Sequence, residues 1–228
     1  MNTQSTSSLK SADESMRSIP ESSELKSPSV LEFYDFLREI AKTPHLHARF
    51  LNTLSLLEYM GSRKILKSQR AESITLELLS HTAEEIRHAQ TFKKLALKVG
   101  EGKVESYAQE HLFCGAEAAA YFQTIDQSAA QHLGHPDPWT NYLLTTLLIE
   151  ERANQIYPFY EDVLASVGYP GHLKLIVREE NSHLQDITAR IEEITPLTPA
   201  LLTELRAIEG AAFTRFTASL RKELSRAR

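Results

Sequence analysis

The segment HTAEEIRHAQ (residues 81–90) places Glu85 three residues before His88, and apolar residues lie on both sides of it. The segment VREENSHLQ (residues 177–185) repeats the same Glu-x-x-His spacing. Since the chain holds 24 Glu and 9 His among 228 residues, two such pairs are only slightly more than random placement would give. The arrangement of the other glutamates therefore decides whether the two motifs belong together.

A lone glutamate precedes each motif. It lies in LLEYMG (56–61) before the first motif and in LIEERA (148–153) before the second, so that Glu58 corresponds to Glu150. Each of these glutamates is followed three positions later by a small residue, Gly or Ala. The chain thus repeats one order, a Glu followed by a Glu-x-x-His motif, which predicts two equivalent helix pairs.

Helical geometry brings these residues to one place. Residues three apart on an α-helix lie on one face, about 4.5 Å apart along the axis, so the Glu and His of one motif can bind one ion or two adjacent ions. Four buried carboxylates need countercharge, which two divalent ions would supply. Carboxylates with two imidazoles suit iron or manganese, whereas structural zinc favours thiolates and the only cysteine is Cys114. The predicted metal ligands are Glu58, Glu85, His88, Glu150, Glu180 and His183.

The composition predicts a globular protein. Hydrophobic residues make up 42% of the chain, and the net charge of −5 with a pI near 6.0 gives no reason to expect nucleic acid or an anionic membrane as a partner. The longest apolar run, YLLTTLLI (142–149), is much shorter than a membrane span. A single cysteine and the lack of an apolar leader favour a cytoplasmic location.

Helical periodicity dominates after an N-terminal tail. Residues 1–29 hold ten Ser and little aliphatic pattern, so we expect a disordered tail there. Residues 30–228 are expected to form one all-α domain, because Gly and Pro are sparse and no hairpin signal occurs. The predicted helices cover residues 30–42, 46–69, 74–98, 115–132, 139–157 and 159–167, a stretch beginning near 172, and 199–226.

Two connections set the expected topology. Pro158 should end the helix that carries Glu150 near Tyr157, because proline removes a helical hydrogen bond, and a short corner helix should follow. The connection 101–136 is longer than an antiparallel hairpin needs, so it should cross the bundle. The helices on either side of it would then run parallel.

This pattern resembles the ferritin-like di-iron-carboxylate superfamily over roughly residues 46–190, since such bundles take one Glu from each of two helices and Glu-x-x-His from each of the other two. The resemblance implies a ferritin-like four-helix bundle with one long crossover plus extra helices. It also implies a cofactor of two iron ions, Fe/Fe or Mn/Fe, that reacts with dioxygen or peroxide. Two histidines resemble the redox enzymes of the superfamily more than its iron stores, which favours an oxidoreductase, in particular an oxygenase acting on a small organic substrate, with an apolar substrate as one option.

The expected partners follow from this resemblance. Rubrerythrins usually add a cysteine-rich iron site, which a single cysteine excludes, so the electrons should come from an external donor. Dioxygen or peroxide and a small-molecule substrate complete the expected partners, without nucleic acid or membrane. A homodimer is an option.

Some residue roles stay open at this level. Glu151 could replace Glu150, because a shift of one position exchanges the two. His81 and Tyr157 are candidates for positions directly behind the ligands. Ile176 stands where the repeat would place a partner for His81, so a core histidine is the favoured interpretation there. Apolar residues at one end of the site are more typical of a packed core than of a substrate pocket.

Two other functions stay open. A ferroxidase or iron-handling protein would require carboxylates that lead outward and assembly into a cage. A metal-free helical scaffold would present the amphipathic stretch 199–226 to a partner, although packing of that stretch beside the bundle is favoured.

Overall fold

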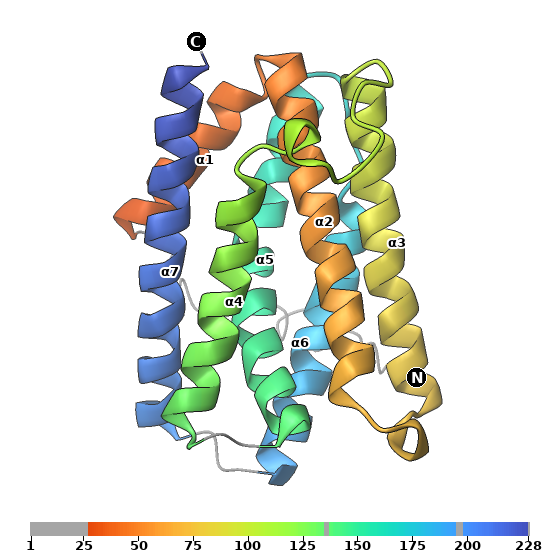
Figure 1. Ribbon diagram of the computed structural model, residues 1–228, viewed down its shortest axis with the longest axis vertical. Helices are drawn as coiled ribbons and strands as arrows, with labels where there is room; N and C mark the ends of the chain where they lie inside the picture. Colours follow the sequence, from red (N-terminus) through yellow and green to blue (C-terminus); the bar gives the residue numbers. More distant parts are fainter. Residues whose placement is uncertain (1–26, 135–136, 195–197, 228) are drawn as a thin grey trace, which may run out of the picture.

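The protein forms an all-helical bundle. The computed structural model describes residues 27–134, 137–194 and 198–227, and within them seven α-helices pack together without any strand (Figure 1). The all-α prediction is confirmed. The expected tail lies, up to residue 26, outside the described residues, and the first helix begins two residues earlier than expected, at Pro28.

The observed helix bounds agree closely with the predicted ones, except in the region after Glu150. Short 3-10 turns at Ala71–Ser73 and Gln109–His111 lie in two of the connections. The α-helices are α1 (Pro28–Ile40), α2 (Pro44–Ser68), α3 (Leu76–Val99), α4 (Gly115–His132), α5 (Pro138–Ser166), α6 (Lys174–Ile194) and α7 (Pro199–Arg226).

Local sequence explains where the helices begin. Four of them start with proline, whose fixed φ suits the first helical position and whose missing N–H would have no partner there. The side chains of Thr75, Asp137 and Thr198 accept hydrogen bonds from the first backbone N–H groups of α3, α5 and α7. The caps of α3 and α5 fix where two of the helices that carry predicted ligands begin.

The helices form two antiparallel pairs, α2 with α3 and α5 with α6, and further helices cover one side (Figure 1). The connection 101–136 contains α4, which runs back along the bundle, so that α3 and α5 point in the same direction as expected (Figure 1). Polar side chains of α2 hold the start of this connection: Asn52 donates to the carbonyls of Ser106 and His111, and Thr53 to that of Phe113.

The predicted break at Pro158 is wrong, because α5 continues through it to Ser166. Packing compensates for the missing hydrogen bond. The ring of Phe159 stacks on Tyr34 at 3.8 Å, and the buried Tyr160 hydroxyl lies 2.7 Å from His47 Nε2. Beyond them Glu161 accepts hydrogen bonds from the backbone N–H groups of Gly171 and Leu173, just before α6. The second half of α5 therefore positions α6.

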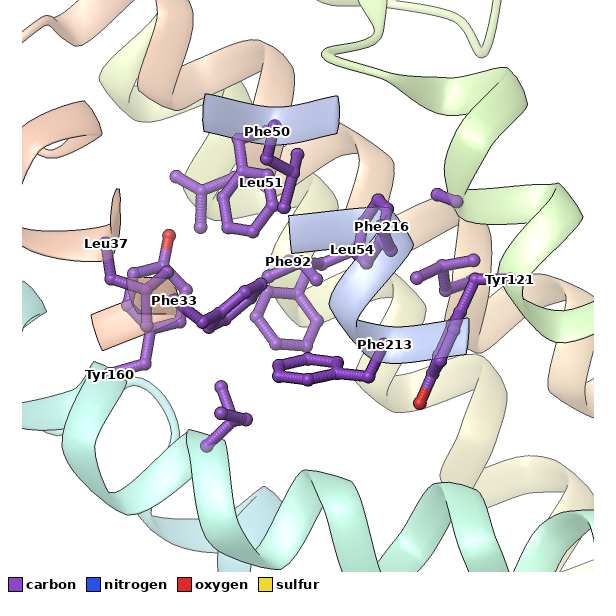
Figure 2. Close-up of a cluster of buried hydrophobic side chains, with 14 of the residues drawn as sticks. Phe33, Leu37, Phe50, Leu51, Leu54, Phe92, Tyr121, Tyr160, Phe213 and Phe216 are labelled. Carbon is purple, nitrogen blue, oxygen red and sulfur yellow. The ribbon is translucent and has the colours of Figure 1, made fainter. Parts of the chain in front are cut away.

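An aromatic core lies where α1, α2, α5 and α7 meet (Figure 2). Phe36 meets Phe50 edge to face at 5.0 Å, and Phe33 lies 5.1 Å from Phe213 of α7. Burying each such ring contributes roughly 1.5–3 kcal/mol. Because Phe213 and its neighbours on α7 are buried within the chain, this helix packs beside the bundle as favoured from the sequence. None of the described helices is both long and apolar enough to cross a membrane.

Candidate metal centre

The structure brings the six predicted residues into one buried cluster between α2, α3, α5 and α6. Each of them is at most 7% exposed, a burial that Glu rarely reaches without a partner. These six residues and His81 are here called the Glu/His cluster. The six are Glu58, Glu85, His88, Glu150, Glu180 and His183. Their common depth follows from the two antiparallel helix pairs.

Within the described residues the donor atoms form two overlapping groups, each with all ligand atoms within 4.8 Å of one another. Glu85 belongs to both groups. Glu180 also lies between them, because its Oε1 is 3.0 Å from His88 Nδ1 and its Oε2 is 3.2 Å from His183 Nδ1. The two groups are Glu58, Glu85, His88 and Glu180, and His81, Glu85, Glu150 and His183.

Two further glutamates orient the histidines. His88 Nε2 lies 2.8 Å from Glu179 Oε2, and His183 Nε2 lies 2.7 Å from Glu84 Oε2. The acidic residue before each motif Glu thus binds the histidine of the opposite motif. Arg87 joins the arrangement at 2.6 Å from Glu179. Because the outer nitrogen of each ring is engaged, the inner Nδ1 is left facing the carboxylates.

Burial and mutual repulsion raise the pKa of three of the carboxyl groups. Desolvation followed by the charge of Glu180 raises the pKa of Glu85 to about 8, and desolvation with neighbouring carboxylates raises those of Glu58 and Glu150 well above their ordinary value. The pKa of Glu180 is lowered in spite of burial, because Glu150 and both motif histidines hydrogen-bond it.

The motif histidines respond to the same carboxylates. Burial opposes their protonation, but the hydrogen bond and charge of Glu180 outweigh it and raise the pKa of His88 to about 10. Hydrogen bonds to Glu180 and Glu84 likewise raise the pKa of His183 to about 9. In the absence of metal, protons therefore supply the positive charge that the buried carboxylates require.

His81 breaks the symmetry of the repeat. Its ring lies 3.9 Å from that of His183, Tyr142 OH is 3.4 Å from its Nδ1, and its buried Nε2 makes no hydrogen bond although Glu85 Oε1 is 3.4 Å away. Desolvation and the nearby His183 lower the pKa of His81 to about 4. A neutral ring with a free nitrogen suits a metal ligand better than a core histidine with satisfied hydrogen bonds.

The remaining predicted residues are also located. Tyr157 donates a hydrogen bond to Glu58 and so lies directly behind the cluster. Glu151 points away from it and pairs with Arg206 at the surface, which leaves Glu150 as the member from α5. The sequence repeat gave no sign of Tyr142 of α5, which is not part of the repeated motif. It also gave no sign of the residues from α1, α4 and α7 that lie near the cluster, because these helices are outside the repeat.

The surroundings of the cluster differ on its two sides. A groove between α3 and α6, here called the α3/α6 groove, is lined by charged residues that include Glu84, Glu179, Asp186 and Arg190. On the opposite side a mostly apolar cavity reaches Glu58 and Glu150, and we call it the carboxylate-side cavity. Comparison with known proteins finds no family model, no curated protein and no solved structure that matches this chain.

Proposed function

We propose that this protein is a ferritin-like di-iron or manganese–iron oxidoreductase that activates dioxygen or peroxide. The observation that carries the proposal is the doubled set of buried donors, two overlapping groups that share Glu85. Four buried carboxylates of which three have raised pKa values are costly in a metal-free protein, and no packing role requires them.

The residues fit a pair of ions. Glu58 and His88 would hold one ion, Glu150 and His183 the other, and Glu85 with Glu180 would lie between them. The buried Nε2 of His81 lacks a hydrogen-bond partner, as expected for an atom that binds metal. A set of carboxylates and imidazoles without thiolate suits iron or manganese.

The bound metal pair would supply the electrons that reduce the oxidant. The chain itself orients the ligands through Glu84 and Glu179, which hold the imidazole rings by their outer nitrogens. The hydroxyl of Tyr157 holds a proton at Glu58 Oε1, where a proton could be delivered during reduction. Apolar side chains on the cavity side exclude water from the same carboxylates. An external donor would restore the electrons.

An iron-handling ferroxidase is the second candidate, and the α3/α6 groove favours it because carboxylates line a route outward. In that groove, however, Glu179 pairs with Arg87 and Glu77 with Arg190. These pairs weaken the attraction for cations. Gel filtration separates the two functions: a 12- or 24-subunit particle would indicate iron storage, and a monomer or dimer the enzyme.

The proposal is tested by metal analysis of matched variants. After expression with added iron, the wild-type chain should carry about two ions of iron or manganese. Glu150→Gln should lose metal, whereas Glu151→Gln, its outward-facing neighbour, should retain it. Less than one ion per wild-type chain, together with a melting temperature unchanged by a chelator, would instead support a metal-free scaffold.

A further inference from the structure

The carboxylate-side cavity has a volume of about 110 Å³ and lies between the Glu/His cluster and helices α4 and α7. Its lining includes Glu58, Glu85, Glu150 and Glu180 together with His81, but neither His88 nor His183. A molecule in the cavity would therefore meet the carboxylates of the metal site and His81, and not the imidazole rings of His88 and His183.

Most of the wall is apolar. Figure 2 shows part of it, where Leu54 of α2 lies near Phe33, Phe213 and Phe216 from α1 and α7. Leu57, Ile149 and Ile156 continue the apolar lining beside the glutamates. Such a surface binds apolar groups and gives little compensation to a polar molecule that leaves water.

The two cations that line the cavity are already matched by carboxylates. Arg152 Nε lies 2.9 Å from Glu209 Oε1, and this glutamate also accepts a hydrogen bond from Tyr121. Lys64 pairs with Asp126. An anionic substrate would have to compete with these ion pairs, so the lining favours a neutral molecule.

Small residues keep the cavity open beside the metal ligands. Gly61 and Ala153, which follow Glu58 and Glu150 by three positions in the sequence repeat, both line it. A Cβ added at Gly61 would lie 2.9 Å from Glu85 Oε2. At Gly61 the small residue therefore leaves room for the Glu85 carboxylate, and at both positions it leaves the cavity wall beside the glutamates without a side chain that could fill the space.

We propose that the substrate is a neutral, largely apolar organic molecule of roughly ten non-hydrogen atoms, bound in this cavity against the carboxylate side of the cluster. The size follows from the volume of about 110 Å³, because each water-sized group needs roughly 10–15 Å³ in this measure. The substrate class rests on the proposed oxidoreductase function, since an apolar cavity alone shows binding and not reaction.

The test compares two probes of equal chain length, 1-octanol and octyl sulfate, by isothermal titration calorimetry on the full-length, metal-loaded protein. 1-Octanol should bind, and octyl sulfate at least about tenfold more weakly because its charge would be desolvated. Octyl sulfate binding as tightly as 1-octanol would overturn the proposed substrate class.

A variant that fills the cavity sharpens the test. Ala153→Phe should weaken 1-octanol binding by at least about tenfold. Ala165→Phe, the same change at an exposed position of α5, should leave it unchanged. Ile149→Ala, which enlarges the cavity, should shift the preference from 1-octanol towards 1-decanol. Equal binding by the wild type and both cavity variants would place the probe elsewhere and refute the proposal.

Metal content measured on the same samples separates the two proposals. Two ions per chain without 1-octanol binding would overturn the substrate class and leave the oxidoreductase function intact. Binding of 1-octanol by a chain that takes up no metal would overturn the oxidoreductase function, and with it the role of the bound molecule as a substrate.

Discussion

The helix pairs α2/α3 and α5/α6 carry the same set of residues but do not surround the metal centre equally. Both supply a Glu, a Glu-x-x-His motif and an acidic residue that binds the histidine of the other pair. One of the positions at which they differ has His81 in α3 and Ile176 in α6. The repeat therefore supplies the shared ligands, while the deviations from it make the two ion positions different.

The largest effect should come from the residue common to both donor groups. Glu85→Gln should reduce the affinity for both ions by more than the about 10- to 100-fold that outer partners contribute, because a neutral amide replaces a shared carboxylate. Equilibrium dialysis against iron or manganese measures this loss. In Glu58→Gln, by contrast, one ion should still bind tightly, since Glu58 belongs to one group only. Identical losses in both variants would show that the two positions are not distinct.

The asymmetry itself is tested at His81. His81→Ala should weaken binding of the ion near Glu150 by roughly tenfold or more and leave the ion near Glu58 unaffected. Mössbauer spectra of the iron-loaded wild type should show two inequivalent irons, and those of the variant should change at one of them. Ile176→Ala removes the residue at the equivalent position of the repeat and serves as the control. A change at both irons, or at neither, would contradict a direct role for His81.

Smaller and nearly equal effects are expected at the glutamates that orient the histidines. Glu84→Gln and Glu179→Gln should each lower metal affinity by about 10- to 100-fold, since the rings lose an ionised partner but keep a hydrogen-bond acceptor. Metal titrations of both variants measure the two losses side by side. A loss in one variant alone would mean that the crossed contacts are not equivalent.

The contact between His47 of α2 and Tyr160 of α5 should affect the stability of the fold and leave metal binding unchanged. Burial lowers the pKa of His47 to about 4, below its ordinary value of 6.5. Its contribution to stability is therefore complete above about pH 6.5 and is lost as the pH falls towards 4. Between pH 7 and pH 4 the free energy of unfolding should therefore fall by roughly 1–3 kcal/mol less in His47→Gln than in the wild type.

Denaturant unfolding of metal-free protein at pH 7 and pH 4 measures this difference. The exposed His45 on the same helix provides the control, as His45→Gln should leave the acid sensitivity unchanged. If both variants reduced the loss of unfolding free energy between pH 7 and pH 4 equally, burial of His47 would not be the cause of that loss.

Periodicity and repetition predicted most of this molecule. The order of Glu58, Glu85 and His88 and its repeat identified the residues that gather in the cluster, because helix pairs with equal spacing bring such residues to one depth. The helix break predicted at Pro158 was wrong. Contacts of Tyr160 and its neighbours with residues distant in the sequence, such as His47, outweigh the one lost backbone hydrogen bond. The carboxylate-side cavity could not be predicted, since its wall combines helices with no common pattern.

The crossed contacts of Glu84 with His183 and of Glu179 with His88 have a mechanical consequence. Both join α3 to α6 across the α3/α6 groove. The cluster and these two contacts therefore link the helix pair α2/α3 to the pair α5/α6. Without its ions the chain would open locally first between α3 and α6. Metal binding would then control how often the helix bundle opens at this interface.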